Sequence, residues 1–102
     1  MDLTKPAAVK IKMVEVHMPC HLGLHMRTAA KFIGFSKRFE SQIEIQCRKF
    51  SANGKSIMGL LCLGVSRNEK MTITVTGDDA DVACCEIEKY FTQMANCSDG
   101  KD

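Results

Sequence analysis

Four side chains that can ligate a metal lie close together near the N-terminus, namely His17, Cys20, His21 and His25. Clusters of histidine and cysteine are typical of zinc sites, and a four-residue spacing would place the histidines on one face of a helix. Pro19 and Gly23 interrupt this segment and break any such helix. We therefore expect His17 and His21 to be solvated residues of a strand end and a loop, and we predict no metal or other cofactor.

His25 lies at a different kind of position, where a glycine-containing loop meets the first turn of a predicted helix. The N–H groups of a first turn have no partner within the helix, and together with the helix dipole they favour an anion. Arg27 adds a permanent charge whose forked donors match phosphate oxygens. The same positive field disfavours the imidazolium form and leaves a nucleophilic nitrogen free. The spacing fits a histidine that accepts a phosphoryl group, and it also fits an N-cap histidine without a chemical role.

The helices that must position these residues follow from hydrophobic periodicity. Apolar residues on one side of 27–39, with basic residues opposite, predict an amphipathic helix. Ser56 precedes a short apolar block that ends at Gly64, which predicts a helix over 57–63 capped by Ser56. An acidic pair at 78–79 favours the start of a last helix. Its core stripe combines Val82 or Ala83, Ile87, Tyr90 or Phe91, and Met94.

Alternation of apolar and polar residues predicts the strands. They cover 13–18, 43–48, a short partner over 49–52, and 71–75. The resulting order is βαββαβα, and the strands are too close in sequence for parallel crossovers throughout. The predicted fold class is therefore α+β, an antiparallel sheet with helices packed on one face.

The two ends of the chain fall outside this pattern. Val9 and Ile11 alternate in the opposite phase to Val14 and Val16, which indicates either a bulge or a separate extended arm. We predict an N-terminal extension over 1–12, one domain over 13–95 and a flexible C-terminal tail over 96–102.

Composition and charge exclude several classes of protein. The 102 residues give room for one domain, and 45% hydrophobic with 25% charged residues excludes disordered and low-complexity classes. Fourteen basic and twelve acidic residues give a net charge of +2, too little for a nucleic-acid binder that must neutralise many phosphates. No apolar run approaches the roughly 20 residues of a membrane span, and the N-terminus has no secretory signal. We expect a cytoplasmic protein without a nucleic-acid or membrane partner.

Two motifs resemble signatures of one protein family. Residues 23–30, Gly-Leu-His-Met-Arg-Thr-Ala-Ala, are similar to the active-site signature of HPr, the histidine-containing phosphocarrier of the bacterial phosphotransferase system. Residues 55–60, Lys-Ser-Ile-Met-Gly-Leu, resemble its regulatory-serine signature at the family's usual distance. The resemblance extends from about Glu15 to Gln93. It implies a two-layer open sandwich, in which three helices cover one face of a four-stranded antiparallel sheet.

By this resemblance the protein is a phosphocarrier rather than a stand-alone turnover enzyme. His25, assisted by Arg27, would take a phosphoryl group on Nδ1 from phosphorylated enzyme I and pass it to enzyme IIA domains. Ser56 would be the site of HPr kinase/phosphorylase, and a transcriptional regulator is a further candidate partner. We expect a monomer. The candidates for partner docking are Leu24, Ile57, Met58 and Leu61, whereas Leu60 and Leu63 are expected in the core.

Three features depart from the family pattern. Thr28 replaces the usual proline, which softens the helix start by ~0.4–1 kcal/mol and restores a backbone donor. We predict that its N–H or hydroxyl contacts the ring or the phosphate of His25. Leu22 replaces a polar residue and removes one possible hydrogen bond near the imidazole. Arg48 and Lys49 occur where a tight hairpin favours Asn-Gly, which predicts a looser hairpin.

Two alternatives from other classes remain. The first is an HPr-like regulatory protein that acts through Ser56 phosphorylation and protein binding, although the presence of His25 argues against it. The second is a thiol or metal-binding module that uses Cys84, Cys85 and Cys97 with the histidines. Adjacent residues on a helix point about 100° apart, so Cys84 and Cys85 are poorly placed to share one metal. Four of the six cysteines lie in apolar periodic segments, and we expect free, mostly buried thiols.

Overall fold

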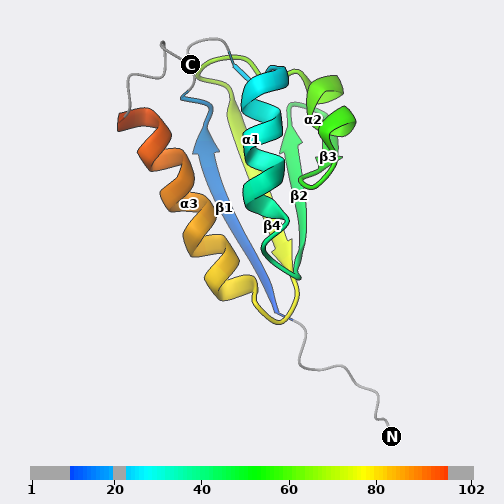
Figure 1. Cartoon of the computed structure of the whole chain (residues 1–102), viewed down its shortest axis with the longest axis vertical. Coiled ribbons are helices and arrows are strands. Elements are labelled where there is room, and N and C mark those ends of the chain that lie inside the picture. The colour runs from blue at the N-terminus through cyan, green and yellow to red at the C-terminus, as the bar shows by residue number, and fades with distance from the viewer. Residues whose placement is uncertain (1–9, 20–22, 97–102) are drawn as a thin grey trace, which may run out of the picture.

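The computed structural model describes residues 10–19 and 23–96, with side chains up to residue 94. It has the predicted order βαββαβα (Figure 1). The elements are β1 (Ile11–His17), α1 (Met26–Ser36), β2 (Gln42–Cys47), β3 (Phe50–Asn53), α2 (Ile57–Leu63), β4 (Lys70–Thr76) and α3 (Ala80–Asn96). None of these helices is long and apolar enough to cross a membrane.

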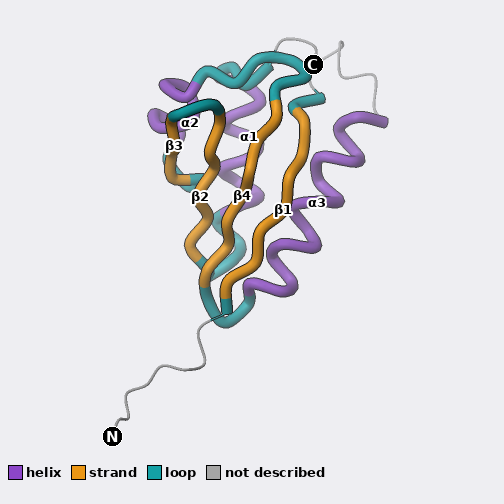
Figure 2. Tube along the Cα trace, turned by 180° about the vertical axis from the view of Figure 1, so that it is seen from behind, coloured by secondary structure: helices purple, strands orange, loops and turns teal. Residues whose placement is uncertain are grey.

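The four strands form one antiparallel sheet in the order β1-β4-β2-β3. All three helices pack on one face, and the other face is left without a helix (Figure 2). The α+β open sandwich predicted from the sequence is therefore confirmed. Since β4 lies between β1 and β2, it pairs with two strands that both precede it in the first half of the chain.

The core lies between the sheet and the helices, and it follows the period-two pattern of the strands. Alternate residues of β2 and β4 are buried, namely Ile43, Ile45, Cys47, Met71, Ile73 and Val75. Phe32 of α1 and Ala83, Ile87 and Phe91 of α3 pack against them, whereas Val82 is 58% exposed. Ala83 is thus the member of the predicted Val82/Ala83 pair that faces the core. Full burial of each large apolar side chain contributes about 1.5–3 kcal/mol to folding.

β1 differs from the prediction at its N-terminal end. The pairing with β4 is continuous from Ile11 opposite Thr76 to His17 opposite Lys70, so neither a bulge nor a separate arm interrupts it. Ile11 and Met13 are each 63% exposed because they point to the face of the sheet that has no helix. The opposite phase of the apolar residues reflects this open face, and Ile11 and Lys12 belong to the domain rather than to an extension.

The ends of the helices are set by local hydrogen bonds. α1 ends at Ser36 rather than residue 39, because the N–H groups of Arg38 and Phe39 bond to carbonyls three residues back instead of four. The Ser36 hydroxyl also donates to Gly54 O at 2.8 Å. Before α3, the carboxylate of Asp79 accepts hydrogen bonds from the Ser41 hydroxyl and from backbone N–H groups at the start of β2. These bonds lower the pKa of Asp79 and tie α3 to the sheet.

The cysteine prediction is half right. Four of the six cysteines are in the described part of the chain, and all four are free thiols. Cys47 is buried, Cys84 is half-buried, and Cys62 and Cys85 are exposed on helix surfaces. The expectation of mostly buried thiols was wrong, because helical apolar periodicity does not say which cysteines lie on the outer edge of an apolar stripe.

Candidate functional site

His25 is the N-cap residue of α1, as its place in the sequence suggested. Its backbone is extended, with φ −113° and ψ −175°, and its carbonyl accepts the first helical bond from the Ala29 N–H at 2.7 Å. The N–H groups of the preceding positions, 26–28, have no acceptor within the helix. The first turn contains no acidic residue that would compete for them. The start of α1 therefore presents donors and a positive dipole end beside the imidazole.

The imidazole lies at the helix start without a cap hydrogen bond. The His25 side chain is half-buried, and the Thr28 N–H is directed at it in a capping-box arrangement, although no side-chain cap hydrogen bond forms. Its Nε2 is buried and has no hydrogen-bond partner among the residues that the structure describes. Arg27 is exposed and makes no hydrogen bond or ion pair with any residue that the structure describes. A reactive ring and a guanidinium are thus both available to an incoming anion within the first turn.

The Thr28 hydroxyl supports the backbone of His25, while the Thr28 N–H is directed at the His25 side chain. The Thr28 side chain is 1% exposed, and its hydroxyl accepts a hydrogen bond from the His25 N–H at 2.9 Å. The same oxygen lies 3.2 Å from Gly23 O and 3.1 Å from His25 O, which can accept its proton. The hydroxyl is therefore committed to backbone groups, and the Thr28 N–H is the part that can reach a phosphate.

The segment before His25 is pinned to the loop between α2 and β4. Gly23 has φ +78°, and a Cβ at this position would lie 2.5 Å from Val65 O. The Leu24 N–H donates to the same carbonyl at 2.8 Å. Only glycine combines this left-handed conformation with so close a backbone approach. The contact with Val65 was not predicted, since nothing in the local sequence indicates which distant carbonyl meets Gly23.

Ser56 caps α2 as predicted. Its backbone is extended, and its Oγ accepts a hydrogen bond from the Gly59 N–H at 3.1 Å. At the other end Gly64 adopts the left-handed conformation that closes the helix. Leu60 and Leu63 face the core with 0% and 3% exposure, as expected. The hydroxyl of Ser56 is half-buried and already occupied by the helix start.

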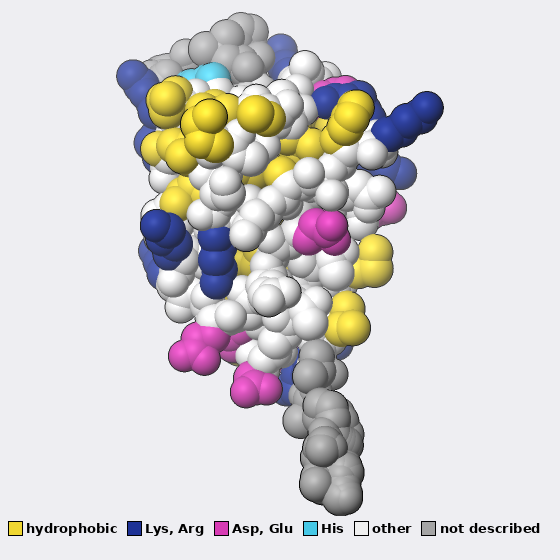
Figure 3. All heavy atoms as spheres, turned by 90° about the vertical axis from the view of Figure 1, so that its right-hand side faces the viewer, with side chains coloured by type: hydrophobic (Ala, Val, Ile, Leu, Met, Phe, Trp, Pro, Cys, Tyr) yellow, Lys and Arg dark blue, Asp and Glu magenta, His cyan; other side chains and the backbone are white. Residues whose placement is uncertain are grey.

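An apolar surface surrounds the start of α1 and α2. Met26 and Met58 are 61% and 66% exposed, and Ile57 and Leu61 are partly exposed. Figure 3 shows hydrophobic side chains gathered beside a histidine at this end of the molecule. Leu24 is 8% exposed and belongs to the core, so its predicted docking role is corrected. We refer to Met26, Ile57, Met58 and Leu61 as the apolar patch.

The β2–β3 hairpin is tight rather than loose. Cys47 pairs with Phe50 across a two-residue turn in which Arg48 has φ +58°. Arg48 donates to Glu69 at 2.5 Å and to the Leu63 carbonyl at the end of α2 at 2.6 Å. The looser hairpin was predicted because Arg-Lys is a poor turn sequence, and these long-range bonds hold the turn in place instead.

Glu69 links this hairpin to the loop that supports Gly23. Its carboxylate accepts from the Ser66 N–H at 2.8 Å, and that bond and the Arg48 guanidinium hold the pKa of Glu69 below its ordinary value. Burial, with the nearby Glu69 charge, raises the pKa of the Cys47 thiol. The backbone of Glu69 also accepts from the Met18 N–H at 2.9 Å. The sequence analysis missed Arg48 and Glu69 as supporting residues, since their partners are distant in sequence.

The described members of the histidine and cysteine cluster do not form a metal site. Within 10–19 and 23–96 there is no group of three histidine, cysteine or acidic side chains that could hold an ion. His17 is exposed at the end of β1, opposite Lys70. Cys20, His21, Leu22 and Cys97 lie outside the described residues.

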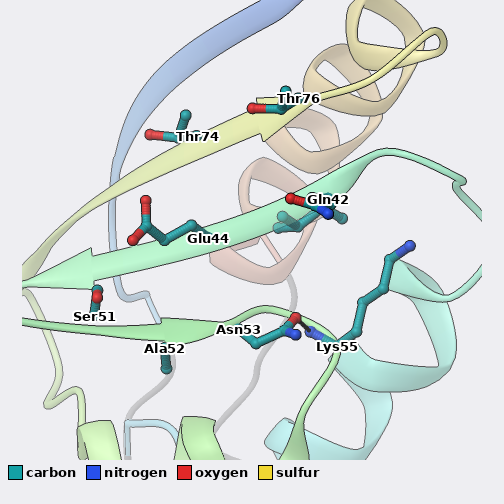
Figure 4. A pocket seen from close by; sticks show the side chains of 9 residues that line it. Gln42, Glu44, Ser51, Ala52, Asn53, Lys55, Thr74 and Thr76 are labelled. Carbon is teal, nitrogen blue, oxygen red and sulfur yellow. Dashed lines mark hydrogen bonds between the residues drawn. The ribbon is translucent and has the colours of Figure 1, made fainter.

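A hollow of about 570 Å³ opens on the helix-free face of the sheet. Figure 4 shows its lining of polar side chains from β2, β3 and β4, with Lys55 at one side. The Lys55 ammonium donates to Phe39 O, and its N–H donates to Asn53 Oδ1 at 2.8 Å. The lining contains no histidine, cysteine or arginine, and none of the predicted site residues. The hollow is therefore separate from the candidate phosphoryl acceptor, His25, at the start of α1.

The fold and this site together define a class of small phosphoryl-accepting domains, in which an open sandwich presents a histidine at a helix start. Residues 12–93 match the family model described as the PTS HPr component phosphorylation site. The chain is 39% identical over 72 residues to the phosphocarrier protein HPr of Buchnera aphidicola subsp. Baizongia pistaciae, covering 71% of this chain and 85% of that protein. It is 33% identical over 73 residues to HPr of Lysinibacillus sphaericus, covering 72% and 83%. The chain belongs to the HPr family, the phosphocarriers of the phosphotransferase system.

Solved structures agree with this assignment. HPr-C-His from Thermoanaerobacter tengcongensis superimposes with a TM-score of 0.80 at 31% identity, over 85% of this chain and 98% of that one. HPr from Bacillus anthracis gives a TM-score of 0.75 at 32% identity, over 79% and 96%. Crh of Bacillus subtilis, at 28% identity and a TM-score of 0.60 over 76% and 90%, is described as a dimer with a swapped domain.

Proposed function

We propose that His25 carries the phosphoryl group of this phosphocarrier, taking it from phosphorylated enzyme I and giving it to enzyme IIA domains. The observation that carries this proposal is the position of His25 at the start of α1, where the first-turn N–H groups have no acceptor within the helix and the imidazole makes no cap hydrogen bond. Arg27 is exposed two residues further along the chain. In the first transfer the donor's bond to phosphorus breaks, the donor keeps the electron pair, and a ring nitrogen of His25 forms the new bond. In the second transfer the nitrogen–phosphorus bond of His25 breaks, the ring nitrogen keeps the electron pair, and the acceptor group of the enzyme IIA domain forms the new bond. Helix-end donors and a guanidinium stabilise the charge on the moving group.

Nδ1 is the nitrogen that we expect to take the phosphoryl group. Nε2 is buried, and a phosphoryl group there would have to displace the atoms that cover it. With the proton on Nε2, the lone pair of Nδ1 is the nucleophile. Phosphorus NMR of the phosphorylated protein distinguishes the two isomers.

Ser56 is proposed as the regulatory position, modified by HPr kinase/phosphorylase. A phosphate adds about −1.5 to −2 charge at a helix start that tolerates negative charge. Ile57 and Met58 of the apolar patch follow directly in the chain. Phosphate on Ser56 would place charge beside the surface that partners are expected to contact, and so slow transfer to His25 without unfolding α2.

The remaining partner assignments follow from the same surface. Enzyme I and the enzyme IIA domains would dock on Met26, Ile57, Met58 and Leu61, and a transcriptional regulator could use the same patch after Ser56 phosphorylation. We propose a monomer in the cytoplasm. The swapped dimer described for Crh makes sedimentation velocity the appropriate test of the monomer assignment.

Incubation of the pure protein with phosphoenolpyruvate and enzyme I tests the carrier assignment. We expect an acid-labile, alkali-stable phosphate that His25→Ala abolishes and that His17→Ala leaves in place, since His17 is an exposed strand residue and is not at a helix start. Label on Ser56 alone, with HPr kinase and ATP, would favour the regulatory alternative. Label that survives His25→Ala in the enzyme I reaction would refute the assignment.

A further inference from the structure

The residue that follows Arg27 carries an arrangement that a proline could not provide. His25 and Thr28 form a capping box, in which the Thr28 N–H is directed at the His25 side chain and the Thr28 hydroxyl at the His25 N–H. The hydroxyl also lies within hydrogen-bond distance of Gly23 O and His25 O. A side chain that is 1% exposed does not exchange these partners for water.

We propose that Thr28 is the positioning residue of this phosphoryl-transfer site. Its hydroxyl fixes the backbone from Gly23 to His25, and its N–H is left as an additional donor for the phosphoryl group on the ring. The proposal rests on the proposed role of His25. Thr28 exchanges no atom in the transfer, because the bond to phosphorus is broken at the donor and formed at the His25 nitrogen.

The hydroxyl and the N–H have separate tasks for a physical reason. The hydroxyl has one proton, and two backbone carbonyls compete for it while its lone pair accepts the His25 N–H. It could reach a phosphate only by abandoning a buried backbone group, which is costly. The N–H belongs to the first turn, has no helical acceptor and is directed at the His25 side chain, so it lies where a phosphoryl group on the ring needs a donor.

Gly23 and Thr28 hold the histidine from both sides. The Leu24 N–H and the close approach of Gly23 fix the loop to Val65, and the Thr28 hydroxyl closes the helix side. Rotation of the His25 backbone would break one of these contacts. Such preorganisation accelerates transfer by keeping the nucleophile oriented, and misplacement by about 1 Å can reduce a rate up to about 100-fold.

Three variants separate the two tasks. Thr28→Val keeps the shape and the N–H but loses the hydroxyl, Thr28→Ser keeps both groups, and Thr28→Pro has neither. For Thr28→Val we expect phosphoryl acceptance from enzyme I to fall about tenfold in kcat with an unchanged KM, because orientation and not docking is lost. Thr28→Ser should restore the rate. For Thr28→Pro we expect the phosphohistidine to hydrolyse about threefold faster, because one charge-assisted donor is missing.

Thr92→Val is the matched control, since Thr92 bonds only to Glu88 O on the exposed side of α3. Circular dichroism and amide exchange of the His25 N–H accompany the kinetics, and exchange should accelerate in Thr28→Val but not in Thr28→Ser. A wild-type rate in Thr28→Val overturns the role of the hydroxyl, and a wild-type half-life in Thr28→Pro overturns that of the N–H. Should Thr28→Val not fold, the rates of phosphoryl acceptance of Thr28→Pro and Thr28→Ser are compared, and equal rates overturn the role of the hydroxyl. Absence of any phosphate on wild-type His25 refutes the carrier assignment instead, while the exchange data still test the hydroxyl bond.

Discussion

The starts of α1 and α2 meet the same physical requirement in opposite ways. At α2 the cap residue uses its own side chain, because Ser56 Oγ accepts from the Gly59 N–H. At α1 the side chain of the cap residue, His25, makes no cap hydrogen bond. The hydroxyl of Thr28, three residues later, accepts from the His25 N–H instead. Both helix starts have unsatisfied donors and a positive dipole end.

The difference teaches how a helix start becomes a reactive site. A side chain that accepts its own cap bond lies against the first-turn N–H groups and competes with an anion for them. At α1 the Thr28 hydroxyl supports the backbone of His25 instead, so no ring nitrogen is committed to a cap hydrogen bond. At α2 the Ser56 hydroxyl oxygen is already engaged by the Gly59 N–H.

Replacement of His25 by a good capping residue should abolish phosphoryl acceptance and raise the stability of the protein. We expect His25→Asn to take no phosphoryl group from enzyme I, and to raise the free energy of unfolding by about 0.5–1 kcal/mol, because asparagine accepts from the first-turn N–H groups. Urea denaturation measures the stability and phosphate incorporation measures the function. Ser56→Asn is the control and should change stability by only a few tenths of a kcal/mol, since both side chains cap well. A less stable His25→Asn would show that the imidazole itself stabilises the helix start.

Gly23 tests the loop side of the α1 start. Gly23→Ala should lower the free energy of unfolding by about 2–3 kcal/mol, because an alanine in the left-handed region is strained and its Cβ would meet Val65 O. Gly34→Ala is the control within α1, where a Cβ meets nothing within 4 Å. It should gain about 0.5–1 kcal/mol from helix propensity. Equal effects of the two substitutions in thermal or urea unfolding would contradict the account of Gly23.

The elements were predictable where the pattern is local. Alternation located β2 and β4, and Ser56 with Gly64 bounded α2 at both ends. The position of His25 at a helix start followed from Gly23 and the apolar stripe of α1. Each of these inferences depends on residues within a few positions of one another, for which propensity and periodicity are informative.

The wrong predictions concern residues whose environment depends on contacts with distant segments of the chain. Leu24 reads as a surface residue beside the site, but the Val65 carbonyl draws its backbone toward the core. Arg48 and Lys49 are unfavourable residues for a tight turn, but hydrogen bonds from Arg48 to Glu69 and to Leu63 O hold the turn in place. The exposed Ile11 looks like part of a separate arm because the sequence does not show that one face of the sheet lacks helices. Tertiary contacts override local preference at all three positions.

Substitutions of Ser56 separate the cap from the charge at the α2 start. Ser56→Ala should cost about 1 kcal/mol of stability through the lost cap, and should leave phosphoryl acceptance by His25 at the wild-type rate. Ser56→Asp should keep the cap but slow acceptance several-fold, because its charge lies beside the apolar patch. Ser66→Ala is the matched control, since that exposed serine bonds to Glu69 through its backbone N–H and carbonyl and not through its hydroxyl. Slow transfer in Ser56→Ala would mean that the cap, and not the charge, controls docking.

Glu69 bonds both to the turn residue Arg48 and to the loop that holds Gly23, and its contribution to stability should depend on pH. Its pKa in the folded protein is lowered by the Ser66 N–H and by Arg48, so its stabilising effect is present above the unfolded value of 4.5 and is lost as pH falls through the folded value. Glu69→Gln should therefore be less stable than the wild type at neutral pH, and the difference should shrink as the solution is acidified below 4.5. Urea denaturation at several pH values measures this difference, with Glu44→Gln on the open face of β2 as the control. A difference that stays constant through the acid range would show that Glu69 acts through packing rather than charge.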